Sequence, residues 1–302
     1  MFKKKIVFGS ANLSSGYGIK KSSGISIVEL NKIYKILIKN NINLIDSAFS
    51  YRESEKKISL SKLKRLNIST KISLNISKKS PISILNLVRK SLKRLKKNFF
   101  YSIYFHNSKD LLSSNGKNFY KEIIELKKKK LTKKIGVSVY SPEELEKLLK
   151  IYYFDIVQIP INVFDRRFIK NKYLYKIKRK GIEIHARSVF LQGILLLDNK
   201  FLPKYFKKWS KIFQKWDEWN INNHQSKILT CINFIKRIKC LDKIVIGVSN
   251  WQQLKEIIEL STSRKIKYPK KIFSNSKCLI DPRRWYLHVF YFQFFNNLFV
   301  FY

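Results

Sequence analysis

Four side chains that could act together on a carbonyl group stand near the ends of short apolar segments. Asp46, Lys71 and His106 each end such a segment, and Tyr51 follows Asp46 by five residues. A tyrosine can donate a proton, although a phenol with an unperturbed pKa of about 10 is a weak acid near neutrality. A lysine ammonium beside the phenol would stabilise the phenolate and lower its pKa, and an aspartate would keep that lysine charged. A histidine could donate a hydrogen bond to the substrate oxygen.

Each of these residues also has an ordinary structural explanation. Lys71 could be a strand-end lysine that extends to solvent, and His106 could be a hydrogen-bonded core histidine. Their recurrence at the same place in successive strand–helix units favours a shared site. Because no side chain delivers hydride, a reduction at this site would need a nicotinamide cofactor.

Alternating strand-like and helix-like segments would position these residues. Apolar and β-branched residues predict strands near residues 6–8, 42–46, 67–71, 100–106, 134–138, 155–159, 181–187 and 243–247. Apolar residues at helical spacing predict helices near 27–39, 53–66, 80–95, 119–129 and 251–260, another beginning at 141–144, and more within 207–239. Eight such units with short connections predict an α/β fold, a (β/α)8 TIM barrel forming a single domain over residues 1–285.

The order Asp, Tyr, Lys and His resembles that of the aldo-keto reductase family. The D-x-A-x-x-Y motif of that family is matched by Asp46, Ala48 and Tyr51, and the resemblance runs over about residues 6–285. It implies an NAD(P)H-dependent oxidoreductase that reduces an aldehyde, ketone or sugar carbonyl to an alcohol. Tyr51 would be the general acid, and the other three residues would complete the catalytic set.

The same resemblance implies where a nicotinamide cofactor binds. The expected contacts are Ser138, Gln158, Arg187, Leu191, Gly193, Gly247, Ser249, Gln253 and Glu256. The first two would hydrogen-bond the nicotinamide carboxamide, the next three would meet the ring and the pyrophosphate, and the rest would meet the adenosine end. Two positions depart from the family pattern: Val139 stands where an Asn is usual, and Arg187 stands where many members stack a Tyr on the nicotinamide.

The sequence distinguishes only weakly between NADP(H) and NAD(H) as the cofactor. Gln253 lies near the place of a basic residue that often binds the 2′-phosphate of NADP(H). Lys255 and the general positive charge would attract a phosphate weakly, because a lone ammonium selects phosphate less strongly than a bidentate Arg. Glu256 suits an adenine contact in either cofactor. We therefore predict NADP(H) over NAD(H), with modest discrimination.

Positive charge dominates the composition. The chain has 63 Lys and Arg residues against 20 Asp and Glu, a net charge of +43. Such an excess often indicates a polyanion partner, but here the basic residues are mostly lysines spread over every predicted helix. Abundant Lys, Ile and Asn fit a bias toward A/T-rich codons, so we expect no specific nucleic-acid partner. The partner that the resemblance implies is a small-molecule carbonyl substrate.

Other sequence features exclude several classes of protein. No Gly-x-Gly-x-x-Gly follows the first predicted strand, which disfavours a Rossmann dehydrogenase. Cys231, Cys240 and Cys278 lack metal-ligand spacing and suit a reduced cytosol, and the first apolar run is too short for a signal peptide. We expect a cytoplasmic protein without a metal site. A non-catalytic nicotinamide-binding barrel, acting as a sensor or accessory subunit, and a basic polyanion-binding protein stay open as alternatives.

The last 17 residues, 286–302, form an uncharged aromatic tail of unknown role. The tail is shorter than the roughly 20 apolar residues that span a bilayer. It could contact a membrane surface or another subunit, or be an extension without function. The sequence leaves its role and the oligomeric state open.

Overall fold

Eight parallel strands close into one barrel in chain order, because β1 pairs with β2 on one side and with β8 on the other. The strands are β1 (Ile6–Gly9), β2 (Leu44–Asp46), β3 (Asn67–Ile72), β4 (Phe100–Phe105), β5 (Thr132–Ser138), β6 (Ile156–Pro160), β7 (Glu183–Arg187) and β8 (Lys243–Ile246). The computed structural model describes residues 2–14, 24–74, 83–263 and 266–285. The predicted (β/α)8 barrel is confirmed, and every predicted strand boundary lies within two residues of the observed one.

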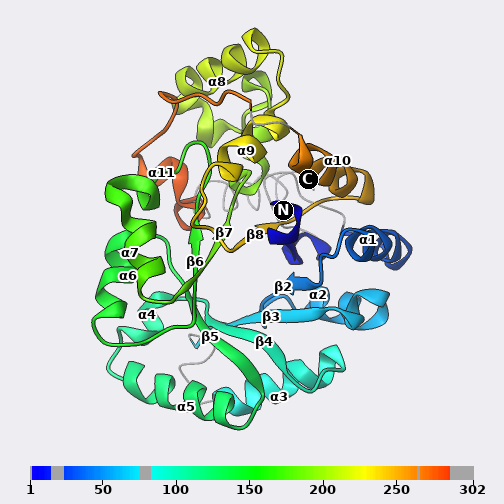
Figure 1. Cartoon of the computed structure of the whole chain (residues 1–302), viewed down its shortest axis with the longest axis vertical. Helices are drawn as coiled ribbons and strands as arrows, with labels where there is room; N and C mark the ends of the chain where they lie inside the picture. Colours follow the sequence, from blue (N-terminus) through cyan, green and yellow to red (C-terminus); the bar gives the residue numbers. More distant parts are fainter. Residues whose placement is uncertain (1, 15–23, 75–82, 264–265, 286–302) are drawn as a thin grey trace, which may run out of the picture.

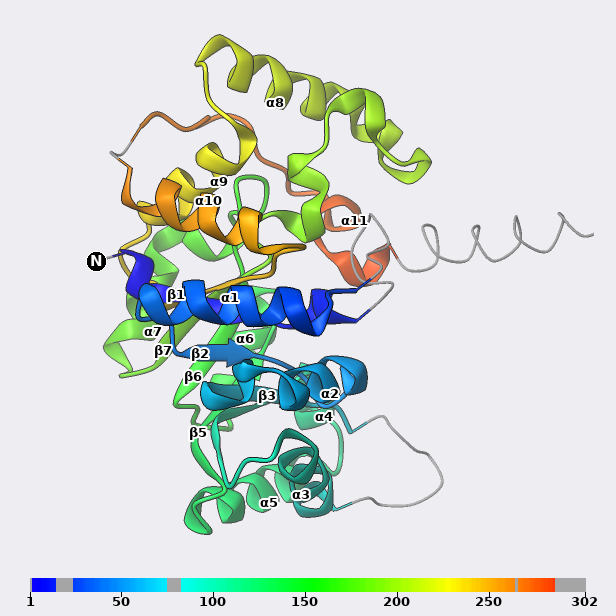
Figure 2. The same cartoon turned by 90° about the vertical axis from the view of Figure 1, so that its right-hand side faces the viewer.

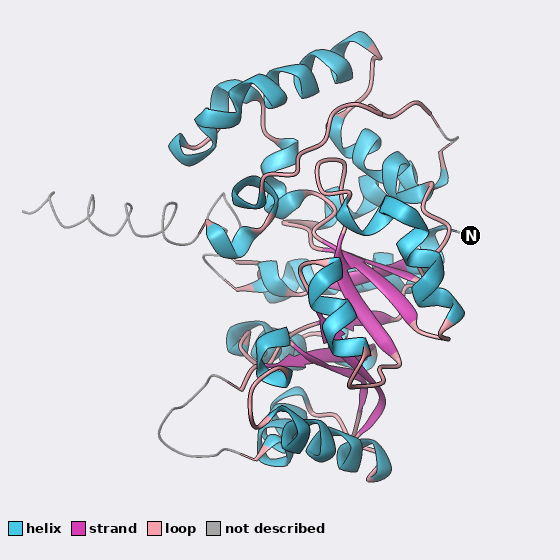
Figure 3. Cartoon of the chain, turned by 90° about the vertical axis from the view of Figure 1, so that its left-hand side faces the viewer, coloured by secondary structure: helices cyan, strands magenta, loops and turns pink. Residues whose placement is uncertain are grey.

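Helices occupy the connections and enclose the strands, as Figure 3 shows. They are α1 (Ile27–Lys39), α2 (Arg52–Leu60), α3 (Ile84–Leu95), α4 (Ser108–Leu111), α5 (Gly116–Lys128), α6 (Pro142–Leu149), α7 (Tyr173–Arg179), α8 (Ser210–Asn222), α9 (Lys227–Lys236), α10 (Trp251–Thr262) and α11 (Lys277–Ile280). In α1 the apolar residues Leu30, Ile33 and Leu37 share one face and are fully buried. Ser26 caps this helix by accepting the Glu29 N–H, so α1 has the bounds that its pattern predicts.

The helix predicted over residues 53–66 is shorter than its pattern indicates. α2 ends at Leu60, and a separate 3₁₀ turn, η3 (Lys62–Arg65), follows it. The Ser61 side chain bonds the Ile58 carbonyl oxygen and accepts the Leu63 N–H, 3.3 Å away. Serine competes for backbone groups in this way, so it ends one helix and begins the next turn.

α8 lies at one end of the molecule, away from the strands (Figures 1 and 2). The Trp216 indole N–H donates to the Leu195 carbonyl oxygen at 3.0 Å, and both side chains are fully buried. Leu195 belongs to η5 (Leu191–Leu196), the turn that follows β7. α8 is therefore hydrogen-bonded to η5, the turn that follows β7 at the carboxyl end of the barrel.

Two buried side chains, Tyr104 of β4 and His185 of β7, meet inside the barrel. A Cβ atom on Gly136 of β5 would lie 2.5 Å from the Tyr104 ring, so only glycine leaves room for this ring. The Tyr104 hydroxyl hydrogen-bonds His185 Nδ1 at 2.9 Å, and both residues are almost completely buried. Side chains thus pack the barrel as a core, and the carboxyl ends of the strands are left for chemistry.

No helix in the described ranges is long and apolar enough to cross a membrane. The aromatic tail predicted at 286–302 and the predicted helix start at 80–82 lie outside the described residues. From Ile84 onward that helix is present as α3, and it ends at Leu95 as predicted.

Candidate active site

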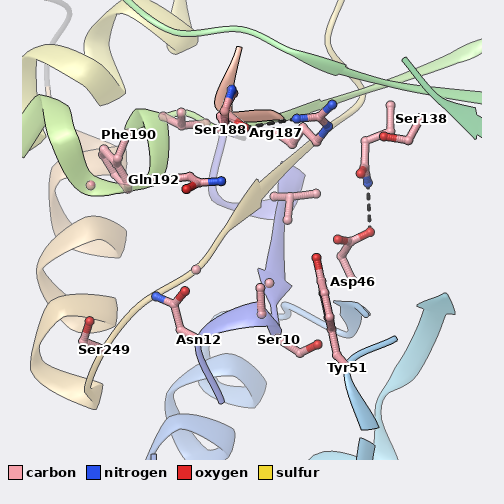
Figure 4. Close-up of a pocket in the computed structure, with 18 of the residues that line it drawn as sticks. Ser10, Asn12, Asp46, Tyr51, Ser138, Arg187, Ser188, Phe190, Gln192 and Ser249 are labelled. Atoms are coloured by element: carbon pink, nitrogen blue, oxygen red, sulfur yellow. Dashed lines mark hydrogen bonds between the residues drawn. The ribbon is translucent and has the colours of Figure 1, made fainter. Parts of the chain in front are cut away.

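A cavity of about 360 Å³ opens among the carboxyl ends of the strands. Eleven of the thirteen predicted site residues line it: Asp46, Tyr51, Lys71, His106, Ser138, Gln158, Arg187, Gly193, Gly247, Ser249 and Gln253. Figure 4 shows this cavity from within. Leu191 and Glu256 are not part of its lining, because the Leu191 side chain is buried in the core and Glu256 is exposed on α10. The barrel thus gathers most of the predicted site in one place.

Lys71 and Asp46 form a buried ion pair at the bottom of the cavity. Lys71 Nζ donates to Asp46 Oδ2 and, at 3.0 Å, to the Ser47 carbonyl oxygen. Their side chains are only 5% and 9% exposed. Desolvation offsets much of the attraction between two such charges, so the pair contributes little to stability. A buried pair of charges that opens onto a cavity is instead typical of a functional site.

The loop between β2 and α2 places Tyr51 beside this pair. The Phe49 N–H donates to the Lys71 carbonyl oxygen at 2.9 Å, which ties the loop to β3. The Tyr51 ring meets the His106 ring edge-on, with centroids 6.3 Å apart and planes at 88°. Tyr51 and Asp46 both point into the cavity in Figure 4. The phenol, the ammonium and the imidazole therefore face one shared space.

Burial and charge set the protonation states of two of these groups. Burial, followed by the charges of Lys71 and Arg187, lowers the pKa of His106 to about 3. His106 is therefore neutral near neutral pH and can donate one hydrogen bond. Burial also lowers the pKa of Lys71, while Asp46 opposes that shift by favouring the ammonium.

Gln158 on β6 links the ion pair to the wall of the cavity. Its Nε2 donates to Asp46 Oδ1 at 2.8 Å, while its Oε1 is buried without a hydrogen-bond partner among the described residues. Ser138 lies opposite Gln158 in the β5–β6 register and also lines the cavity. A buried acceptor left unpaired costs free energy unless a ligand supplies a donor. A primary carboxamide, such as that of nicotinamide, carries the required N–H group, so these residues fit the cofactor.

Three planar groups stack at the rim of the cavity. The Arg187 guanidinium carbon lies 4.0 Å from the centre of the Tyr140 ring, and that of Arg283 lies 3.7 Å from it. Arg283 is neutralised by Asp281 and Glu144. Arg187 donates only to the Ser188 hydroxyl and the Val139 carbonyl oxygen, both at 3.2 Å. Within the described chain no carboxylate lies within ion-pair distance of Arg187, so its charge is available to a ligand.

The turn after β7 has an unusual backbone. Ser188, Leu191 and Gln192 have φ values of 58°, 48° and 53°, and Gly193 has 91°. Left-handed conformations cost non-glycine residues free energy and tend to gather at functional sites. The Asn162 amide N–H donates to the Ser188 carbonyl oxygen at 3.0 Å and helps to hold the turn. Leu191 itself does not line the cavity, so its contact with a cofactor stays a prediction.

The end of the cavity near α10 carries the residues expected at the adenosine phosphate. Ser249 and Gln253 line it there, and the Ser249 N–H donates to Gln253 Oε1 at 2.8 Å. A Cβ atom on Gly247 would approach only the Asn12 side chain, at 3.6 Å. This end is therefore open and polar.

Several lining residues were not predicted from the sequence. They are Gly9, Ser10, Ala11, Asn12, Tyr140, Ser188, Val189, Phe190, Leu196, Leu197, Val245 and Pro282. Tyr140 follows Ser138 by two residues at the end of β5, so its position could have indicated it. Asn12 and Pro282 gave no such signal, because they lie on turns far apart in the sequence. The described residues contain no group of three potential metal ligands.

Comparisons with known proteins agree with this geometry. The profile described as "Aldo/keto reductase family" matches residues 5–272. The fold is similar to that of an aldo-keto reductase of Bacillus halodurans in its holo form, with a TM-score of 0.68, 16% identity and coverage of 87% of this chain and 88% of the other. It is also similar to a glycerol dehydrogenase of Gluconobacter oxydans, with a TM-score of 0.64, 18% identity and the same coverage. No curated protein matches the chain.

Proposed function

The chain belongs to the aldo/keto reductase family, and on this basis we propose that it reduces the carbonyl of an aldehyde, ketone or sugar with NAD(P)H. The bound nicotinamide cofactor would supply the hydride. Tyr51 would donate the proton to the carbonyl oxygen as the alcohol forms. Lys71 would stabilise the phenolate left on Tyr51, and Asp46 would keep Lys71 charged and oriented.

His106 would orient the substrate. A neutral imidazole facing the same space as Tyr51 can donate a hydrogen bond to the carbonyl oxygen. That bond strengthens as negative charge develops on the oxygen, so it favours the transition state over the bound substrate.

The cofactor contacts are proposed from the same cavity. Ser138 and the unpaired Oε1 of Gln158 would meet the carboxamide, and Arg187 would lie against the nicotinamide ring. The pyrophosphate and adenosine would run past Leu191, Gly193, Gly247, Ser249 and Gln253 toward Glu256. The modest preference for NADP(H) expected from the sequence rests on the lysine-rich surface alone, because no arginine occurs between residues 247 and 256 to bind a 2′-phosphate.

One observation carries this proposal: a buried lysine–aspartate pair opens onto the cavity that also holds Tyr51 and His106. A non-catalytic barrel has no need of an ammonium beside a phenol, and burying that ammonium is costly. The intact set therefore favours an enzyme over a sensor or accessory subunit.

A carbonyl screen tests the proposal. Purified protein is mixed with NADH or NADPH and with aldehydes, ketones and aldoses, and oxidation of the cofactor is followed by its absorbance. We expect turnover with at least one class of carbonyl and none with the Tyr51→Phe variant. Tight cofactor binding without turnover across the panel would instead indicate a nicotinamide-binding barrel.

A further inference from the structure

The amino end of α10 borders the adenosine end of the cavity, and the backbone N–H groups of Ser249, Trp251 and Gln253 there are already hydrogen-bonded. Asn250 caps the helix by accepting the Gln253 N–H at 2.8 Å. Gln253 in turn accepts the Ser249 N–H through Oε1, also at 2.8 Å. Free N–H groups at a helix start are what makes that position attractive to phosphate. Here the N–H groups of Ser249, just before the cap, and of Gln253, in the first turn, are both bonded within the chain.

A third donor is taken by a carboxylate from another helix. Glu29 of α1 accepts the Trp251 N–H through Oε1 at 2.7 Å, across 222 residues of sequence. α1 and α10 lie side by side in Figures 1 and 2. A negative charge near a helix N-terminus is stabilised by the helix dipole, so Glu29 occupies the place that an external anion would take.

The charge of Glu29 is only partly offset by its surroundings. Its other oxygen lies 4.0 Å from Lys32 Nζ, whose side chain is 54% exposed and therefore well screened by solvent. No arginine occurs between residues 247 and 256. Lys255, the basic residue of that stretch, is exposed and lies 3.9 Å from Glu259. The one basic residue of this stretch is thus already beside a carboxylate.

We propose that Glu29 makes this protein select NAD(H) over NADP(H). A 2′-phosphate at the α10 end would meet the like charge of Glu29 and would have to displace the bonds to Ser249 and Trp251. A free ribose hydroxyl carries no charge and can donate to a carboxylate. The inference rests on the proposed use of a nicotinamide cofactor, and it runs against the NADP(H) preference predicted from the lysines.

Cofactor affinity, measured without any carbonyl substrate, tests this selection. Quenching of the five tryptophans by NADH and by NADPH gives a dissociation constant for each cofactor. We expect the parent protein to bind NADH about ten-fold or more tightly than NADPH, a difference of about 1.4 kcal/mol. In Glu29→Gln the amide oxygen can still accept the Trp251 N–H but the charge is gone, so NADPH affinity should rise several-fold while NADH affinity changes less than two-fold.

A matched control separates this local effect from the overall charge. Glu125→Gln removes an exposed carboxylate from α5, which does not line the cavity, and should leave both affinities unchanged. Tighter binding of NADPH by the parent, or an equal effect of Glu29→Gln on both cofactors, would overturn the selection by Glu29 and leave the proposed function intact. Failure of the parent to bind either cofactor would instead refute the proposed function, and the selection with it.

Discussion

The Gln158 side-chain amide donates a hydrogen bond to Asp46 Oδ1 at 2.8 Å. The same carboxylate accepts Lys71 through Oδ2. Asp46 therefore joins a residue proposed to hold the nicotinamide carboxamide to the residue proposed to activate Tyr51. A carboxamide that bonds the unpaired Oε1 of Gln158 would hold this amide in place and with it the ion pair. If the cofactor binds as proposed, its binding and the arrangement of Lys71 are physically linked.

The Tyr51→Phe variant should lose catalysis but keep its cofactor. The ring packs against His106 without its hydroxyl, so the site should keep its shape. We expect kcat to fall by about 10²–10⁴-fold, the usual contribution of a positioned acid. Cofactor dissociation constants should stay within about three-fold of the parent. Turnover near the parental rate would remove Tyr51 from the mechanism.

Lys71→Met should lower kcat and change its pH dependence. Without the ammonium nothing stabilises the phenolate of Tyr51, and Asp46 is left as a buried charge without its partner. The pH–rate profiles of the variant and the parent, measured over the same range, provide the comparison. If the two profiles have the same shape, Lys71 does not tune the acid. Circular dichroism checks that the variant is folded.

His106 should remain neutral over the whole range from pH 5 to 8. Its folded pKa of about 3 lies below the usual 6.5, so below pH 6.5 the unfolded chain binds a proton that the native state does not. The His106 contribution therefore reduces native stability as pH falls from about 6.5 toward 3. Histidine NMR should show a His106 imidazole signal that does not titrate above pH 5, and His106→Gln should abolish that signal. A His106 resonance that titrates near pH 6.5 would contradict the prediction.

Gly136→Ala should destabilise the barrel. The added methyl group would lie 2.5 Å from Tyr104 Cδ1 and 2.9 Å from the Ile156 carbonyl oxygen, so the core must shift at a cost of about 1–3 kcal/mol. Denaturant unfolding monitored by circular dichroism measures this loss. Gly247→Ala is the matched control, because its methyl group would make only an ordinary 3.6 Å contact with Asn12. The control should keep the parental midpoint or exceed it.

That the proposed catalytic residues lie together could be predicted from the sequence because strand ends are local features. Asp46 and Lys71 each close a short apolar segment, and parallel strands in register bring such ends to one edge of the barrel. Ser138 and Gln158 were instead expected from the resemblance to the aldo-keto reductase family, and the structure places both in the lining of the cavity.

Contacts between distant turns and helices could not be predicted in this way. Glu29 follows Ser26 by three residues, a spacing typical of a capping box, so the sequence indicates a local role for it. The structure instead directs its carboxylate to Trp251. The end of α2 was also predicted wrongly, because the helical periodicity of apolar residues continues to Leu66. The helix instead ends at Leu60, where the Ser61 side chain bonds the backbone of Ile58 and Leu63. In both cases the deciding bond involves a side chain whose partner is not set by periodicity.

The guanidinium groups stacked at the rim of the cavity should affect the rate at which the cofactor associates with the protein. The charged side chains that line the cavity are Asp46, Lys71 and Arg187, and the first two neutralise each other. Because Arg283 is compensated outside the cavity while Arg187 is not, the opening carries one net positive charge. A cationic opening draws an anionic dinucleotide toward itself during diffusion. We therefore expect the association rate constant of the cofactor to fall steeply with ionic strength, while its dissociation rate constant changes little.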